Sequence, residues 1–350
     1  MKAYTPKKSN ASVSIRYALM SICLSSVCHS VIFSCLNDYI SYDRRSMLIV
    51  LFNVISVGMM SLLSVFADKV KIKHTGVRLS VLLTVLGFCM PVTFGIDLKV
   101  TLLGLGSAIF YSFAASSILS RSKGKSRNIG LLIGGQALGI AFASYTGFAG
   151  HVAAPLLMIL AIPRDEYQNE EQDEEAAEKP SFSLLPFLFL CFSYILLSYE
   201  FSSFTFSWNV GFKTQFQLLL LTGLGQCAGG FACDLIGRMA TVTAAASSGT
   251  LLIYFCSDTK WLSLLGLFLL SMSLTPIVTS VTRMMPKHPG FSFAIMSAMA
   301  YFGEIITHLI DFQRVTMLFI CALIISVAVT ASLPLFLQSE ETEDQANEDI

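Results

Sequence analysis

The chain has 350 residues, of which 54% are hydrophobic and only 13% are charged, with a mean hydropathy of +0.68. A water-soluble domain of this length would expose far more charge, so the composition excludes an ordinary soluble enzyme or binding domain. Basic and acidic residues balance at 23 each, which gives no reason to expect a nucleic-acid partner. We therefore expect a polytopic membrane protein whose surroundings are the lipid bilayer.

Apolar runs long enough to cross a membrane recur along the whole chain. A helix needs about 20 apolar residues to cross about 30 Å of hydrocarbon. Because backbone polar groups must be paired within lipid, and the alternating pattern of a β-barrel is absent, we expect helices. In chain order, the twelve predicted spans are 17–36, 46–67, 79–96, 100–120, 129–147, 150–163, 182–203, 214–233, 239–257, 261–282, 290–310 and 315–338.

A strongly acidic segment divides these runs into six and six. Residues 164–181 cannot bury an apolar face, so they are interpreted as a solvated linker, and the acidic tail 339–350 is interpreted in the same way. Docking of a partner protein on either segment is the alternative. The predicted organisation is an N-terminal six-helix bundle over 1–163 and a C-terminal six-helix bundle over 182–338, and we expect a monomer.

The distribution of basic residues predicts the orientation. With the N-terminus inside, 17 of the 23 Lys and Arg residues fall on inner segments. Because inner loops of membrane proteins carry an excess of Lys and Arg, both termini are predicted to be cytoplasmic, as for a protein of the cell (cytoplasmic, inner) membrane.

A short motif lies between the eighth and ninth runs, at residues 230–239. Its residues Gly230, Asp234, Gly237 and Arg238 resemble the loop between the second and third helices of a half-domain in major facilitator superfamily transporters. Asp234 falls on the cytoplasmic side in the predicted topology. A carboxylate in this position can interact with the positive N-terminal end of a neighbouring helix, an effect of about 0.3–1 kcal/mol.

The first half holds a degraded copy of this motif, between the second and third runs. Asp68, Lys69 and Lys73 are kept, whereas Ser64 replaces the first glycine and Lys71 the second. From these departures we expect a weaker or differently shaped contact in the first half.

The resemblance covers about residues 14–338 and implies an all-α membrane protein with twelve transmembrane helices. It implies two pseudo-symmetric six-helix bundles around a central cavity that opens to each side in turn. In this family the repeated loop helps to close the cytoplasmic face and is released when the protein switches.

Polar residues within the spans are the candidates for binding or coupling. Glu304 lies well inside an apolar run, where a carboxylate must be protonated, paired or in contact with water, and His308 follows one turn later. This pair is the candidate proton site, with a packing role as the alternative. Further candidates for this site are Glu200, His29 and Asn53, which helical rise places in the outer half of the membrane with Glu304. The last candidates are Tyr111, Gln136 and Gln226, for each of which a contact between helices is the alternative interpretation.

No cofactor or metal site is expected. Glu304 and His308 have helical metal-ligand spacing but no third ligand nearby, and the nine cysteines form no recognisable metal or disulfide pattern. The sequence therefore favours a secondary transporter for a small organic solute, driven by an ion gradient or by the solute's own gradient, with protons coupled through Glu304 as the specific hypothesis. A receptor or scaffold that keeps the fold without transport is the alternative, motivated by the degraded first-half loop. An enzyme is disfavoured, because we find no nucleophile–base pair.

Overall fold

The computed structural model describes the chain over residues 10–32, 42–70, 73–122, 125–160, 184–203, 206, 208 and 211–309. Helices account for nearly all of this part. The predicted linker 164–181, the predicted twelfth span 315–338 and the tail 339–350 lie outside the described residues, so the twelve-helix count and the domain boundaries stay predictions.

The first group of helices corresponds to the predicted spans one to six. In chain order its elements are α1 (Asn10–Ser30), α2 (Tyr42–Asn53), the π-helical turn η2 (Val54–Gly58), α3 (Met59–Lys69), α4 (Lys73–Cys89), the 3₁₀ turn η3 (Val92–Phe94), α5 (Ile96–Ser122) and α6 (Ser126–Leu160). Because α2, η2 and α3 follow one another without a gap, they form the single predicted span 46–67.

The second group corresponds to spans seven to eleven. Its elements are α7 (Leu184–Ser203), α8 (Phe212–Ile236), α9 (Arg238–Cys256), α10 (Lys260–Met272), α11 (Leu274–Met284) and α12 (Pro289–Leu309). The predicted span 261–282 consists of α10 and α11, which are separated at Ser273. Pro276 accounts for this break, because it has no N–H to bond the carbonyl one turn before it.

The helix α6 covers the predicted span 129–147 and most of the predicted span 150–163. Its part that is long and apolar enough to cross a bilayer is Ser126–Tyr145. The division of this region into two spans stays a prediction.

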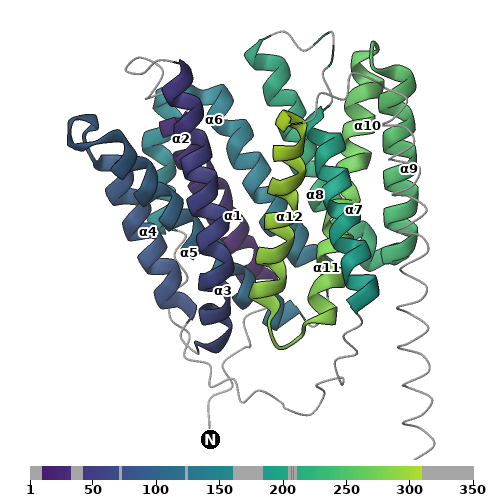
Figure 1. Ribbon diagram of the computed structural model, residues 1–350, viewed down its shortest axis with the longest axis horizontal. Helices are drawn as coiled ribbons and strands as arrows, with labels where there is room; N and C mark the ends of the chain where they lie inside the picture. Colours follow the sequence, from purple (N-terminus) through teal and green to yellow (C-terminus); the bar gives the residue numbers. More distant parts are fainter. Residues whose placement is uncertain are drawn as a thin grey trace, which may run out of the picture.

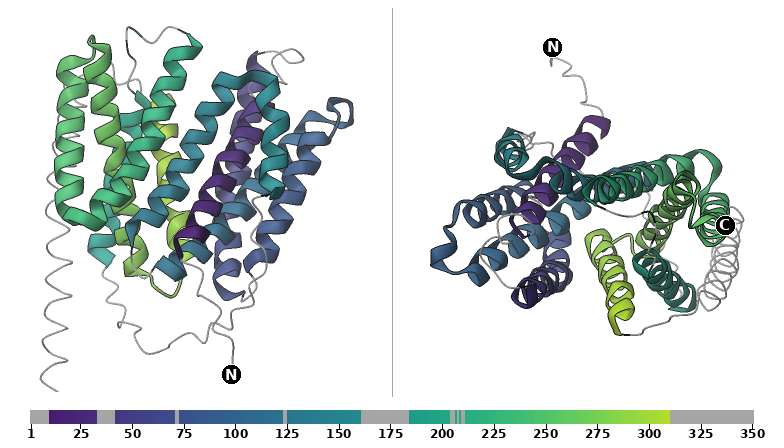
Figure 2. Two further views of the ribbon diagram at one scale, coloured as in Figure 1. Left: turned by 180° about the vertical axis from the view of Figure 1, so that it is seen from behind. Right: turned by 90° about the horizontal axis from the view of Figure 1, so that it is seen from above.

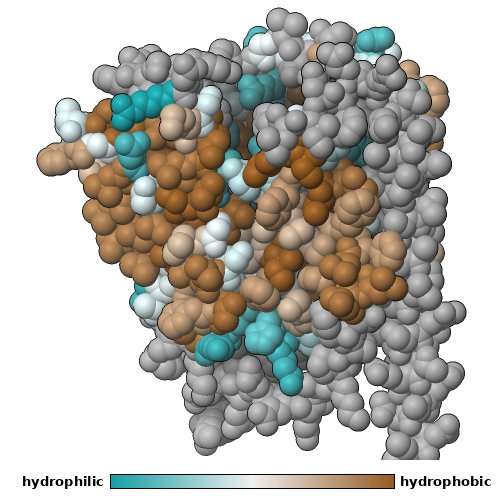
Figure 3. Space-filling model, in the orientation of Figure 1, coloured by the Kyte–Doolittle hydropathy of each residue, from teal (hydrophilic) through white to brown (hydrophobic). Residues whose placement is uncertain are grey.

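The molecule is a multi-pass membrane protein. Eight helical segments in the described part of the chain are long and apolar enough to cross a bilayer. Large apolar side chains such as Leu62, Phe255 and Trp261 are more than two-thirds exposed, as expected when lipid rather than water surrounds them. The visible face is apolar across its middle, with hydrophilic side chains near its upper and lower edges (Figure 3).

The two groups of helices lie side by side (Figures 1 and 2), with α1 to α6 on one side and α7 to α12 on the other. In the first group α5 is the most enclosed helix, and its Phe110, Ala114 and Ala115 are fully buried. We call the end at which α3 and α8 end and α6 and α12 begin the inner end, following the predicted orientation; it lies at the bottom of Figure 1.

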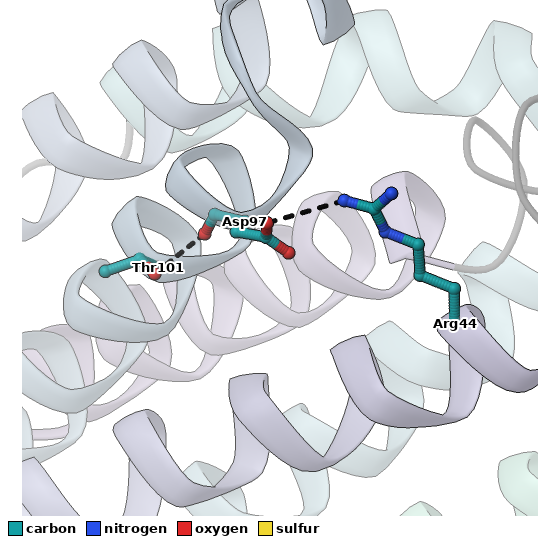
Figure 4. Close-up of polar contacts among 3 residues, drawn as sticks. All are labelled: Arg44, Asp97 and Thr101. Atoms are coloured by element: carbon teal, nitrogen blue, oxygen red, sulfur yellow. Dashed lines mark hydrogen bonds and ion pairs between the residues drawn. The ribbon is translucent and has the colours of Figure 1, made fainter.

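The outer end of the first group is held by charged residues on α2 and α5. Arg44 forms an ion pair of 3.5 Å with Asp97, and both side chains are more than half exposed (Figure 4). Lys99, by contrast, is buried, and its ammonium donates to the carbonyls of Phe88 (3.0 Å) and Met90 (2.9 Å) at the end of α4. Lys99 thus caps a helix C-terminus, where a positive charge is stabilising.

Candidate functional site

The first-half loop carboxylate contacts the second group of helices. Asp68 lies in the last turn of α3, and its two oxygens accept hydrogen bonds from the backbone N–H groups of Gly290 (2.9 Å) and Phe291 (3.0 Å). These amides belong to the first turn of α12, where no helical carbonyl is available to them. Asp68 therefore caps a helix of the other half of the chain.

The second-half carboxylate makes the reciprocal contact. Asp234 lies in the last turn of α8 and accepts hydrogen bonds from the backbone N–H groups of Ser126 (2.7 Å) and Arg127 (3.1 Å). These are the first two residues of α6. Each half therefore supplies one carboxylate and receives one at a helix N-terminus, where the helix dipole adds to the hydrogen bonds. We call these two contacts the inner-end caps.

The two inner-end caps have the same shape, so the expectation of a differently shaped contact in the first half is wrong. Each consists of two oxygens on two consecutive backbone amides, at 2.9 and 3.0 Å for Asp68 and at 2.7 and 3.1 Å for Asp234. Backbone amides are present in any sequence, so the loss of the flanking glycines leaves the contact intact.

The other predicted loop residues have separate roles. Gly237 has a φ of +89°, which a residue with a side chain rarely adopts, and it forms the one-residue turn between α8 and α9. Arg238 follows it and lies close enough to Cys233, next to Asp234, to interact electrostatically. Lys69 is exposed, whereas Lys73 donates to the Ser116 carbonyl of α5 (3.0 Å) and to the Ser120 hydroxyl (3.2 Å).

Glycines bring α6 and α8 into close contact between the two groups. A Cβ at Gly230 would lie 2.8 Å from the Ser126 carbonyl oxygen, and one at Gly134 would lie 2.6 Å from the Gly223 carbonyl oxygen. Nearer the outer end, the ring of Phe216 packs 4.9 Å from that of Tyr145. The two helices therefore touch over several turns, starting from the Asp234 cap.

Glu304 is exposed rather than enclosed by its apolar neighbours. It lies on α12 about 21 Å from Gly290 by helical rise, near Tyr301. Gly303 beside it packs on α7, where a Cβ would lie 2.4 Å from the Ile195 carbonyl oxygen. His308 belongs to the last turn of α12, and its side chain lies outside the described residues.

Glu200 is the buried carboxylate of the predicted set. It lies near the end of α7, only 2% of it is exposed, and the hydroxyl of Thr250 on α9 contacts it. A Cβ at Gly303 would lie 2.9 Å from the Tyr199 backbone nitrogen. This crossing of α7 and α12 puts Glu200 and Glu304 at the same level of the outer half, on different helices.

The remaining predicted polar residues divide between helix contacts and accessible positions. The Tyr111 hydroxyl is buried and hydrogen-bonded to Ser21 (2.9 Å) and Ser25 (2.8 Å) of α1, so it serves as a contact between α1 and α5. Gln226 is also buried, and its Oε1 has no hydrogen-bond partner among the described residues. Gln136 of α6 is exposed.

His29 and Asn53 are half-buried in the outer half. His29 is followed by a π-helical end of α1 at residues 31–32, and Asn53 directly precedes η2. Such π-helical turns are rare and are frequent at functional sites. Each of the two residues thus lies beside a π-helical turn.

Sequence reasoning missed the partners of the inner-end caps, because they are backbone amides and carry no side-chain signature. Ser126 and Pro289 were usable signals, since serine and proline favour the first positions of a helix. Thr250, the neighbour of Glu200, gave no signal, because an isolated threonine within an apolar run is common in membrane helices.

No protein-family model matches the sequence, and no curated protein matches it. One solved structure that does match is a crystal structure of a bacterial homologue of the iron transporter ferroportin in an outward-facing state. The TM-score is 0.60 at 10% identity, over 95% of this chain and 99% of that one. The fold is of the major facilitator type. At this identity the likeness concerns the fold alone.

In the described part of the chain, no three side chains of His, Cys, Asp or Glu come together in a way that could hold a metal ion.

Proposed function

We propose that this protein is a secondary transporter that moves a small organic solute across the cytoplasmic membrane by alternating access, with both termini in the cytoplasm. The observation that carries the proposal is the pair of inner-end caps formed by Asp68 and Asp234. In this proposal the structure represents the state that is closed toward the cytoplasm.

The caps suit a closure that must open repeatedly. Each consists of two charge-assisted hydrogen bonds between a helix of one half and a helix of the other, and neither cap is fully buried. Hydrogen bonds to charged groups contribute about 1.5–3 kcal/mol each. Energies of this size are enough to favour the state that is closed toward the cytoplasm. A solute that binds more tightly to the other state can reverse this preference.

The alternative is a receptor or scaffold without transport. Its motivation was the degraded first-half loop, and the retained Asp68 cap removes much of that motivation. Coupling to protons remains part of the proposal, with Glu304 and His308 as first candidates and with Glu200, His29, Asn53, Tyr111, Gln136 and Gln226 as the further candidates from the sequence. Glu304→Gln tests the first of these candidates, since loss of pH-driven transport with expression intact would assign the proton to Glu304.

The first test measures the change of state. Spin labels at the exposed residues Lys69 and Lys287 report the separation of α3 and α12 at the inner end, and labels at Met47 and Trp261 report the outer end. In the Asp68→Asn, Asp234→Asn double variant in nanodiscs, the inner pair should move apart while the outer pair approaches. If neither distance changes, the protein does not alternate and the scaffold is favoured.

The second test establishes transport. A thermal-shift screen of metabolites and drugs identifies ligands, because a ligand that binds the folded state raises its stability. Divalent cations are included, since a matching fold belongs to a homologue of an iron transporter. Counterflow of each ligand into proteoliposomes follows, and ligands that bind but are never exchanged would contradict the transporter assignment.

A further inference from the structure

The side chain of Glu200 is enclosed inside the second group of helices. Its neighbour on the same face of α7, Leu197, is 1% exposed, and Glu200 itself is 2% exposed. An ionised carboxylate in a membrane helix costs several kcal/mol unless protein groups or water compensate for it. Glu304 lies at the same level on α12 but is exposed, so the two carboxylates differ in environment rather than in depth.

Two aromatic residues follow α7 beyond its outer end. Directly after α7, the rings of Phe206 and Trp208 stack at 4.9 Å, and Phe206 is buried. The Trp208 indole donates to the Ser257 carbonyl (3.0 Å), which ties this segment to the turn between α9 and α10. Thr250 of α9 faces Glu200 from the same helix that leads into this turn. Glu200 and Thr250 thus lie on the two helices, α7 and α9, whose following segments are joined by the bond from Trp208 to Ser257.

Several other titratable or charged groups lie on α11 and α12, which pack against α7, and on α9, which contributes Thr250. In the described part of the chain they are Arg238, Tyr254 and Cys256 on α9, Arg283 on α11, and Tyr301, Glu304 and His308 on α12. The two arginines lie at the inner end, beside Cys233. Glu304 and His308 can each bind a proton and lie on the same half of the membrane as Glu200, so an experiment must separate these three.

We propose that Glu200 is the residue that carries the coupling proton, with Thr250 as its positioning residue. This rests on the proposed transporter function and assigns the coupling step to Glu200 in place of Glu304. The carboxylate takes a proton from water on one side of the membrane, holds it while α7 and α9 enclose the side chain, and returns it to water on the other side when the helices rearrange. One O–H bond forms and the same bond breaks, so no further reactant is required.

The proton on Glu200 is tested by infrared spectroscopy of the purified protein in nanodiscs. A pH titration should show a carboxylic-acid C=O band that is absent in Glu200→Gln and retained in the matched Glu304→Gln and in His308→Ala. In Thr250→Val the band should stay but its midpoint should move to higher pH, because a hydroxyl that donates to the carboxylate favours the ionised form. A band that survives in Glu200→Gln, or that vanishes in Glu304→Gln, overturns the proposal.

Coupling is tested with the spin-label pair at Lys69 and Lys287. In the otherwise unchanged protein, the distribution between closed and open inner ends should depend on pH. In Glu200→Gln this dependence should fall at least fivefold, and in Glu304→Gln it should persist. If Glu200→Gln is not recovered as a monodisperse protein, the Thr250→Val midpoint decides in its place, and an unmoved midpoint counts against the proposal.

The two proposals fail in different ways. An inner end that never opens, even in the Asp68→Asn, Asp234→Asn double variant, contradicts transport itself. An inner end that opens without any dependence on pH leaves the transporter intact and removes only the role of Glu200.

Discussion

Replacing Asp68 with Asn tests how much an inner-end cap contributes. Both carboxylate oxygens accept a backbone N–H, at 2.9 and 3.0 Å, whereas an asparagine offers one oxygen and turns an NH₂ donor toward the other N–H. One hydrogen bond is lost and the other loses its charge. Because bonds to charged groups contribute about 1.5–3 kcal/mol and neutral ones about 0.5–1.5, we expect a net loss of about 1–3 kcal/mol. This corresponds to an increase of about 5–150-fold in the open population.

Hydrogen–deuterium exchange measures this effect at the amides themselves. Gly290 and Phe291 lie in the first turn of α12, so their N–H groups are protected by Asp68 rather than by helical carbonyls. Their exchange should accelerate in Asp68→Asn by the same factor as the open population, and exchange at Ser126 and Arg127 should accelerate in Asp234→Asn.

The matched control is Asp97→Asn, which removes an exposed carboxylate at the outer end. It should leave exchange at both inner-end caps unchanged. The reasoning is refuted if Asp68→Asn leaves exchange at residues 290 and 291 at the level of the unaltered protein. If amide exchange at residues 126 and 127 also accelerates in Asp68→Asn, the two caps open together as one unit.

Three further predictions concern stability, each measured by thermal unfolding in detergent. Gly134→Leu should destabilise the protein by about 1–3 kcal/mol, because even a Cβ there would lie 2.3 Å from the Cys227 Sγ, whereas Gly58→Ala meets nothing within 4 Å and serves as control. Lys99→Met should lower the free energy of unfolding by about 1.5–3 kcal/mol, because the two carbonyl contacts at the end of α4 are lost. Arg44→Ala should lower it by less than about 1 kcal/mol, because the ion pair of Arg44 is exposed. Equal losses for the two variants would contradict the reasoning that a buried charge contact contributes more than an exposed one. Tyr111→Phe should lower stability by about 1–2 kcal/mol through the lost bonds to Ser21 and Ser25, and should leave the affinity for any identified ligand unchanged, which a ligand-contacting tyrosine would not do.

The sequence predicted the positions of the helices in the described part of the chain, because a span needs about 20 apolar residues and this requirement is visible without tertiary information. Hydropathy also ranked Glu304 above Glu200. Both carboxylates lie within apolar runs. Only the packing of the helices decides that Glu200 is buried within the second group of helices while Glu304 stays exposed. The direction in which a membrane helix faces is weakly encoded, since lipid and protein interiors are both apolar.

The inner-end caps explain why a sequence motif can erode while its contact persists. In the second half, Gly230 packs on α6 and Gly237 forms a turn, so these residues place Asp234 locally. In the first half, Ser64 is fully buried and α3 passes through Lys69 before the turn, so the helix itself carries Asp68 to α12. Small residues are instead found on the receiving side, where a Cβ at Gly290 would lie 3.0 Å from the Ser116 Cβ. The requirement for close approach is thus met by the partner helix, and the two caps share a geometry that their loop sequences do not.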